Sequence, residues 1–168
     1  MDEFDNIEDH FAAYARQLAD DPSARYGALR NCSFFDPVSD DWLQRMSEMA
    51  QVKTFHSDVC VTTQDEEMKA FYVILYGSAE AFRNGKQVGT IATGDCFGEG
   101  IFFADGNITT SATVIADDKF IAAEFSKAVV EEMQRDPRAM VSVNKALLLA
   151  LFKKLKAANE KIERLMLK

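Results

Sequence analysis

Helical periodicity marks the start of the chain. Apolar residues recur at spacings of three and four, at Phe4, Ile7, Phe11, Tyr14 and Leu18. This spacing predicts an amphipathic helix over residues 3–19, which the sequence Asp20-Asp21-Pro22-Ser23 ends. We expect residues 1–27 to form a helical extension that packs on its own domain or on a partner.

The pattern changes to strand-like runs after a second predicted helix. Ser39 is a suitable N-cap for that helix, whose apolar face carries Trp42, Leu43, Met46 and Met49. Short β-like runs separated by turns then follow at 52–56, 59–62, 70–75, 79–83, 87–91, 111–116 and 119–125. Asn84-Gly85 between two runs is typical of a type I′ hairpin. Many short strands at this spacing indicate a β-sandwich or barrel, and periodicity alone does not choose between them.

The C-terminal part is helical again. Ser126 is the expected N-cap of a helix over 127–135, and Asp136-Pro137 breaks it before a long helix over 138–168. Apolar positions in the long helix alternate in steps of three and four at Leu148, Leu151, Leu155, Ala158, Ile162 and Leu165. This a/d pattern favours a parallel homodimer seam, and docking of the helix on its own barrel is the alternative.

Composition narrows the class of protein. The 168 residues are 48% hydrophobic and include 13 Phe, which is enough for one domain core. A net charge of −8 disfavours binding to nucleic acid or anionic membranes, because both rely on basic surface. Without a signal-peptide pattern or an apolar run long enough to span a bilayer, we expect a soluble, cytoplasmic protein.

Groups that would support catalysis or metal binding are sparse. The two histidines, His10 and His56, fall in different predicted elements, and no metal-ligand cluster, nucleophile elbow or phosphate-loop motif is present. Cys32, Cys60 and Cys96 are unclustered, so we expect reduced thiols buried as small hydrophobes. The sequence therefore predicts neither an enzyme nor a metal protein.

Residues 91–114, IATGDCFGEGIFFADGNITTSATV, carry the candidate chemistry. Glycines let a backbone approach a ligand closely, and a carboxylate between them, Glu99, can accept hydrogen bonds from a sugar hydroxyl. Hydroxyl and N–H groups around Ser111 can bind an anion. This stretch resembles the phosphate-binding cassette of the cyclic-nucleotide-binding domain family, found in catabolite-activator/FNR-type regulators and in cyclic-nucleotide-gated kinases and channels.

The resemblance covers roughly residues 28–168. It includes the opening segment Leu29-Arg30-Asn31-Cys32-Ser33-Phe34-Phe35, the central strand Phe71–Gly77 and Ala158-Asn159-Glu160-Lys161-Ile162 in the last helix. It implies a mostly β protein with flanking helices, in which a double-stranded β-helix (jelly roll) occupies 28–136. N-terminal helices precede the roll, and a C-terminal helix over 137–168 dimerises and faces the ligand.

The resemblance also implies a ligand site. Its residues are Phe97, Gly98, Glu99, Gly100, Thr110, Ser111, Ala112, Lys154, Ala158 and Asn159. Glu99 would accept from the ribose 2′-hydroxyl, and Ser111 would contact the phosphate. Thr110 stands where ligand-binding members have an arginine, so one hydroxyl replaces a charged, bidentate group.

Two residues of the last helix are expected to compensate for that replacement. Lys154 would pair with Glu99 or with the ligand's anion, and Asn159 would bond to a purine edge within the subunit or across the dimer. The loop between Gly100 and Ser111 is expected to be a residue or two longer than usual. The apolar pocket wall is expected to draw on Val73, Leu75, Phe82, Ile91, Phe97 and Phe102, with more of these residues in the core than in the wall.

Three functions are compatible with these features. The favoured one is a regulatory sensor that binds cAMP, cGMP or a related small anion and signals through its C-terminal helix to a protein partner. The alternatives are a ligand-free assembly module of the same fold and a sensor for a different ligand. Regulators of this family usually carry a helix-turn-helix after the long helix, and the sequence here contains none, so we expect no direct DNA binding.

Overall fold

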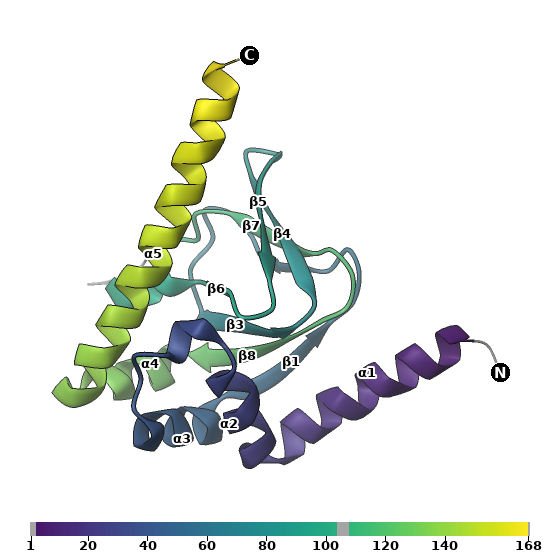
Figure 1. Ribbon diagram of the computed structural model, residues 1–168, viewed down its shortest axis with the longest axis vertical. Coiled ribbons are helices and arrows are strands. Elements are labelled where there is room, and N and C mark those ends of the chain that lie inside the picture. Colours follow the sequence, from purple (N-terminus) through teal and green to yellow (C-terminus); the bar gives the residue numbers. More distant parts are fainter. Residues whose placement is uncertain (1–2, 104–107, 168) are drawn as a thin grey trace.

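The computed structural model describes residues 3–103 and 108–167, and it has two four-stranded antiparallel sheets flanked by five α-helices (Figure 1). The strands are β1 Gln51–Phe55, β2 Cys60–Thr62, β3 Ala70–Tyr76, β4 Ser78–Arg83, β5 Lys86–Ala92, β6 Cys96–Phe97, β7 Thr113–Ala116 and β8 Phe120–Ser126. One sheet has the order β1-β8-β3-β6 and the other β2-β7-β4-β5. The jelly roll with flanking helices is therefore confirmed.

Strand β3 shows how the apolar pattern builds two cores. Successive side chains of a strand point to opposite faces of the sheet. Ala70, Tyr72 and Ile74 accordingly belong to the core between the two sheets. Phe71, Val73 and Leu75 belong to the larger core between the first sheet and the helices. A strand covered on both faces has to be apolar throughout, as the sequence of β3 is.

Three helices precede the roll, α1 Glu3–Asp20, α2 Pro22–Arg30 and α3 Asp40–Met49. The sequence pattern did not predict α2, because the residues that end α1 also start the next helix. Asp21 caps α2 by accepting from the N–H of Ser23, and Pro22 occupies its first turn. Residue 27 lies within α2 and residue 137 is the first of α5, and the division into three domains stays a prediction.

Arg25 of α2 joins the three N-terminal helices. Its buried guanidinium donates to the carbonyl of Ser47 in α3 at 2.7 Å and to that of Leu18 in α1 at 2.8 Å. A buried charge is tolerated when its donors are satisfied in this way. Arg25 is therefore a structural residue of the helical layer.

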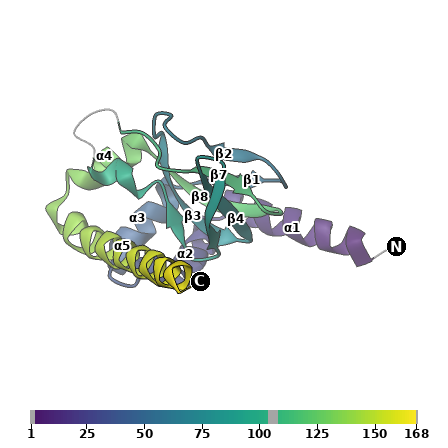
Figure 2. The same cartoon turned by 90° about the horizontal axis from the view of Figure 1, so that it is seen from above.

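Helix α1 packs on its own domain through its second half. Phe11 and Tyr14 contact the ring of Tyr76 on β3, and Leu18 is fully buried. Ile7 is exposed, and the first half of α1 projects from the opposite side of the roll to α4 (Figure 2). The side chain of Phe4 lies outside the described residues.

Turns and caps agree with their sequence signals in most places. Asn84 and Gly85 both have positive φ, as a type I′ hairpin requires. The Ser126 hydroxyl accepts from the N–H of Val129 and caps α4, whereas Ser39 has the N-cap position of α3 without a side-chain hydrogen bond. The sequence analysis missed β6 and two 3₁₀ turns, η1 Ser33–Phe35 and η2 Glu99–Phe103, because each is too short to show a period.

The three cysteines are free, and two of them are buried as expected. Burial, with a smaller contribution from Asp95, raises the pKa of Cys32 to about 11, and burial is also the main reason that the pKa of Cys96 rises to about 12. The expectation of burial is wrong for Cys60, which is exposed. Cys60 begins β2, an edge strand with no sheet neighbour on one side.

Two helices follow the roll, the short α4 Lys127–Gln134 and the long α5 Pro137–Met166. Asp136 caps α5 by accepting from the N–H groups of Arg138 and Ala139. The first part of α5 is built into the core, and its C-terminal part runs along the roll and beyond it (Figure 1). None of the described helices combines the length and the apolar character needed to cross a bilayer.

Candidate functional site

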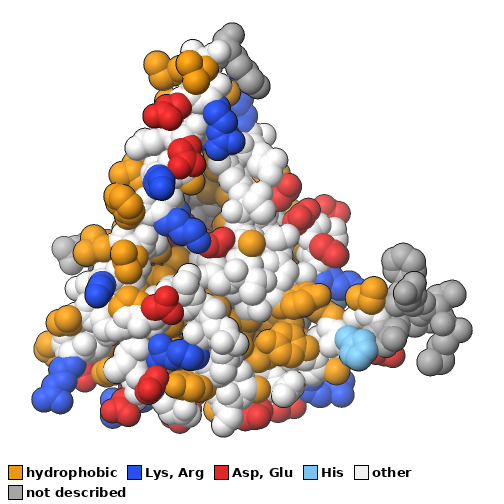
Figure 3. All heavy atoms as spheres, in the orientation of Figure 1, with side chains coloured by type: hydrophobic (Ala, Val, Ile, Leu, Met, Phe, Trp, Pro, Cys, Tyr) orange, Lys and Arg blue, Asp and Glu red, His pale blue; other side chains and the backbone are white. Residues whose placement is uncertain are grey.

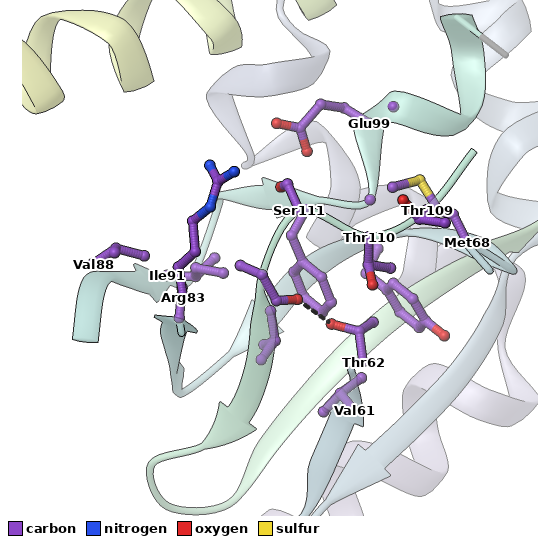
Figure 4. Close-up of a pocket in the computed structure, with 18 of the residues that line it drawn as sticks. Val61, Thr62, Met68, Arg83, Val88, Ile91, Glu99, Thr109, Thr110 and Ser111 are labelled. Atoms are coloured by element: carbon purple, nitrogen blue, oxygen red, sulfur yellow. Dashed lines mark hydrogen bonds between the residues drawn. The ribbon is translucent and has the colours of Figure 1, made fainter. Parts of the chain in front are cut away.

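A cavity of about 960 Å³ lies between the second sheet, the segments around residues 98 and 111, and α5 (Figure 4). This volume is within the range of about 300–1,000 Å³ that is usual for small-molecule sites. Its floor is apolar and includes Val61, Ala70, Tyr72, Ile91, Phe97 and Val114. Polar and charged groups lie around this floor, so the cavity suits a ligand with one apolar face and several polar groups.

The packing of the chain favours glycine on both sides of Glu99, at positions 98 and 100. Gly98 has a φ of +78°, and a side chain there would collide with the backbone carbonyl of Ala70. At Gly100 a Cβ would lie 3.2 Å from the Cε of Met68, which is tight. The two glycines therefore bring the start of η2 down onto β3, and this placement sets the position of Glu99 at the cavity.

Glu99 is paired with a lysine of α5. The Nζ of Lys154 lies 2.5 Å from Oε1 of Glu99 and also donates to the carbonyl of Cys96 at 2.8 Å. The Glu99 side chain is 14% exposed and that of Lys154 44% exposed. The predicted pairing of Lys154 with Glu99 is thus present, and it spans the boundary between the roll and the helix.

Two further lysines hold α5 against the roll. Lys153 lies 3.1 Å from the carboxylate of Asp95, and Lys161 donates to the carbonyls of Gln87 and Val88 at 3.3 Å. Lys161 also lines the cavity, although the sequence analysis did not select it. Together with Lys154, these residues attach the second part of α5 through polar contacts, which solvent weakens.

Thr110 lines the cavity but directs its polar groups elsewhere. It is 6% exposed, and its hydroxyl donates to the carbonyl of Thr63. Its N–H donates to the carbonyl of Glu66 at 2.9 Å, and its carbonyl accepts from Asp65. The hydroxyl of Thr110, which was expected to contact the ligand, therefore bonds to the backbone of the chain itself.

Ser111 and Ala112 differ from Thr110 in this respect. Ser111 is exposed, and both residues line the cavity. Among the residues that the structure describes, none accepts a hydrogen bond from the N–H of Ser111 or of Ala112. Two adjacent unpaired N–H groups can bind an anion.

The cavity brings together all the sequence-predicted ligand residues except Asn159. One helical step of about 100° separates Asn159 from Ala158, which does line the cavity. The contact of Asn159 with a ligand across a dimer stays a prediction. Part of the lengthened loop after Gly100, residues 104–107, lies outside the described residues.

The apolar residues considered for the pocket wall lie more often in the core than in the wall, as predicted. Ile91 and Phe97 line the cavity. Val73, Leu75 and Phe102 lie instead in the core between the first sheet and the helices, because the alternation of β3 and the turn of η2 point them there. Phe82 is half-buried and outside the lining.

The sequence analysis also missed Arg83 as a lining residue. A signal was present, since Ala79, Ala81 and Arg83 alternate along β4 and must share one face. Ala79 is buried between the sheets, and Ala81 lines the cavity with Arg83. Within residues 3–103 and 108–167, no group of three His, Cys, Asp or Glu side chains is arranged to hold a metal ion.

The sequence matches one protein family. The model of the cyclic nucleotide-binding domain family matches residues 52–136, which span β1 to the end of α4. Among curated proteins, none is similar enough in sequence to count as a match.

Solved structures with the same fold come from distant relatives. A putative cyclic nucleotide-binding protein from Geobacter metallireducens superposes with a TM-score of 0.67 at 16% identity, over 76% of this chain and 95% of that one. The sensor domain of the transcriptional regulator DNR from Pseudomonas aeruginosa gives 0.62 at 20%, over 84% and 93%. The regulatory domain of Toxoplasma gondii PKA, crystallised with cAMP, gives 0.65 at 22%, over 79% and 50%. At these identities the likeness shows the fold alone.

Proposed function

The chain belongs to the cyclic nucleotide-binding domain family, and we propose that it is a sensor that binds a cyclic nucleotide or a related small anion. Members of this family are regulatory domains that are generally not enzymes. In the proposal the ligand is cAMP or cGMP, bound in the cavity under α5 by Gly98, Glu99, Ser111 and Ala112. The proposal also locates the protein in the cytoplasm.

The ion pair between Lys154 and Glu99 is the observation that carries the proposal. A carboxylate at the edge of an apolar cavity is a suitable acceptor for a ribose hydroxyl, and Glu99 lies at such an edge. In the structure Lys154 of α5 donates to this acceptor. A ligand hydroxyl on Glu99 would therefore compete directly with a contact that holds the helix.

This competition gives a route for signalling. Past Leu147 the described part of α5 has no fully buried side chain, and lysines supply its polar contacts with the roll. A ligand shifts a two-state equilibrium by its difference in affinity for the two states. A ligand that binds better when Lys154 has left Glu99 would favour a released second half of α5, which a partner protein would detect.

The exposed apolar residues of α5 support the proposed homodimer. Leu148, Leu155, Ile162 and Leu165 are all more than half exposed, and hydrophobic side chains follow α5 in the space-filling view (Figure 3). Leu151 and Ala158 belong to the same proposed seam and also line the cavity. Seam and ligand site thus share one helix, so movement of the helix would affect both.

A second function has its own support. The occupied hydroxyl and N–H of Thr110 remove one source of ligand contacts, and the apolar face of α5 would serve assembly without any ligand. In that case the domain is a ligand-free interaction module. The two functions differ in whether the cavity binds a cyclic nucleotide.

Thermal unfolding with millimolar cAMP, cGMP or AMP distinguishes them. A ligand at 100 times its Kd adds about 2.7 kcal/mol to the free energy of unfolding, which raises the Tm by several degrees in a domain of this size. The sensor is expected to respond to one cyclic nucleotide and not to AMP. Absence of a response to both cyclic nucleotides contradicts a cyclic-nucleotide sensor and leaves the ligand-free module or a sensor for a different ligand.

Variants test the role of Glu99. Glu99→Ala is expected to abolish the ligand-dependent rise in Tm while leaving a folded protein. Glu80→Ala is the matched control, because Glu80 is on β4 outside the cavity lining. An equal loss of response in both variants would show that the loss reflects the charge change and not the contact.

A further inference from the structure

Arg83 offers an unused cation to the cavity. It lies at the end of β4, is exposed, and lines the cavity. Its guanidinium makes no hydrogen bond or ion pair with any described residue. Figure 4 shows its side chain extending from the strand toward Ser111 and Glu99. A guanidinium presents a planar fork of donors that fits a phosphate group better than a single ammonium does.

The strand register brings Arg83 next to the unpaired N–H groups. β4 and β7 pair from Ala79 opposite Ala116 to Phe82 opposite Thr113. One further step in the same register puts Arg83 opposite Ala112. Directly opposed residues have Cβ atoms about 4.5–5.5 Å apart. A guanidinium on this residue is therefore within reach of an anion held by the N–H groups of Ser111 and Ala112.

The backbone beneath Arg83 is fixed by the neighbouring loop. The side chain of Gln64 accepts from the N–H of Asn84 at 2.8 Å and donates to its side-chain oxygen at 2.9 Å. The N–H of Gln64 in turn donates to the hydroxyl of Thr113 at 3.0 Å. These bonds join the hairpin after Arg83 to the strand that follows Ala112, so they hold the backbone of Arg83 beside the segment that carries the N–H pair.

We propose that Arg83, with the N–H groups of Ser111 and Ala112, forms the binding site for the ligand's phosphate group. This inference rests on the proposed function, since it concerns the same cavity. It divides the cavity into two ends, an anionic end at Arg83 and a hydroxyl-binding end at Glu99. The specificity that follows is for a phosphorylated ligand over the uncharged nucleoside.

The test uses ¹⁵N-labelled full-length protein titrated separately with cAMP, adenosine and inorganic phosphate. The readouts are the Kd and the NMR signals of the Arg83 side chain and the Ser111 and Ala112 amides. Arg83→Gln removes the guanidinium. Lys86→Gln is the matched control, because Lys86 pairs with Arg83 in the same hairpin and does not line the cavity.

We expect Arg83→Gln to weaken cAMP binding at least about tenfold and Lys86→Gln to change it less than about threefold. Adenosine is expected to bind wild type and Arg83→Gln alike. If wild type and Arg83→Gln bind cAMP equally, the phosphate site is refuted while the sensor function stands. If cAMP does not bind but phosphate shifts the Ser111 and Ala112 amide signals in the wild type and not in Arg83→Gln, the anion site stands and the cyclic-nucleotide function fails. Absence of any response to cAMP and phosphate overturns both.

Discussion

The two halves of α5 have similar apolar content, but among the described residues only the first half has fully buried side chains. In the first half, Ala139, Val143, Ala146 and Leu147 are buried against η1, α4 and the first sheet. In the second half, Leu155, Ile162 and Leu165 are exposed, and Lys153, Lys154 and Lys161 make the polar contacts with the roll. One continuous helix therefore combines a hydrophobic anchor with a segment held by interactions that are individually weak.

This difference between the two halves of α5 assigns stability to the first half and regulation to the second. Burial of a large apolar side chain contributes about 1.5–3 kcal/mol, whereas a partly exposed ion pair contributes at most about 1 kcal/mol. The second half can consequently move at a cost that a small ligand is able to supply. The first half keeps the helix attached to the domain while this happens.

The largest expected effect is the loss of the anchor. Leu147 is fully buried, so Leu147→Ala is expected to lower the free energy of unfolding by about 2–5 kcal/mol through lost contacts and a cavity. Leu155 is 59% exposed. Leu155→Ala is expected to change the free energy of unfolding by less than about 0.5 kcal/mol when the protein is measured as a monomer at low concentration. Urea unfolding followed by circular dichroism measures both values. Equal losses in the two variants would contradict the division of the helix.

The next effect concerns self-association. Leu155→Asp places a charge in the centre of the proposed seam and is expected to weaken a homodimer at least about 100-fold. Sedimentation velocity over a concentration series measures this change. Lys156→Asp, on an exposed neighbouring position, introduces the same residue and is expected to leave the association within a few-fold of wild type. An unchanged oligomer in Leu155→Asp would rule out this seam.

The same comparison shows what the sequence alone predicted. The steps of three and four in α5 predicted the helix, and the a/d pattern selected Leu148, Leu151 and Leu155 as one face. It did not distinguish the anchor from the exposed segment, because periodicity reports which residues share a face and not where the covering layer ends. That end is set by η1 and α4, neither of which overlaps α5 in sequence.

The candidate site was predictable where a short motif fixes a local conformation. Gly98-Glu99-Gly100 and Ser111-Ala112 identify the cavity segments, and the sequence pattern also predicts the pairing of Lys154 with Glu99. Arg83 was missed because its role follows from the register of β4 on β7, which pairs residues that are far apart in the chain. The engagement of Thr110 with the loop at residues 63–66 is a long-range contact of the same kind.

A smaller effect is expected at the lysine contact itself. Lys154→Met removes the ion pair with Glu99 but keeps a side chain of similar length, so the global stability is expected to change by less than about 1 kcal/mol. Amide hydrogen exchange in residues 151–166 is expected to accelerate several-fold, while exchange around Val143 stays at the wild-type rate. Lys156→Met is the control, because no ion pair of Lys156 is found in the described structure. Uniform acceleration along α5 would show that the lysine supports the whole helix.

The buried thiols of Cys32 and Cys96 allow the two halves of α5 to be compared separately, because each thiol lies near a different half. Cys32 adjoins η1, which the anchor covers, and the carbonyl of Cys96 accepts from Lys154. Burial raises the pKa of both from an ordinary value of 9.0, to about 11 for Cys32 and about 12 for Cys96. Because the folded pKa is the higher one, folding favours the neutral thiol. The stability it contributes is complete below pH 9 and is lost as pH rises toward 11 to 12.

The expected result is slow labelling of both thiols at pH 8 in a Cys60→Ser protein, since the reactive thiolate forms only on opening. Lys154→Met is expected to accelerate labelling of Cys96 a few-fold and to leave Cys32 unchanged, as mass spectrometry of the labelled peptides would measure. Opening at Cys96 then reports release of the second half of α5, and opening at Cys32 reports loss of the anchor. Equal acceleration at both cysteines would mean that the helix opens as one unit, and the ligand would have to act against the whole core.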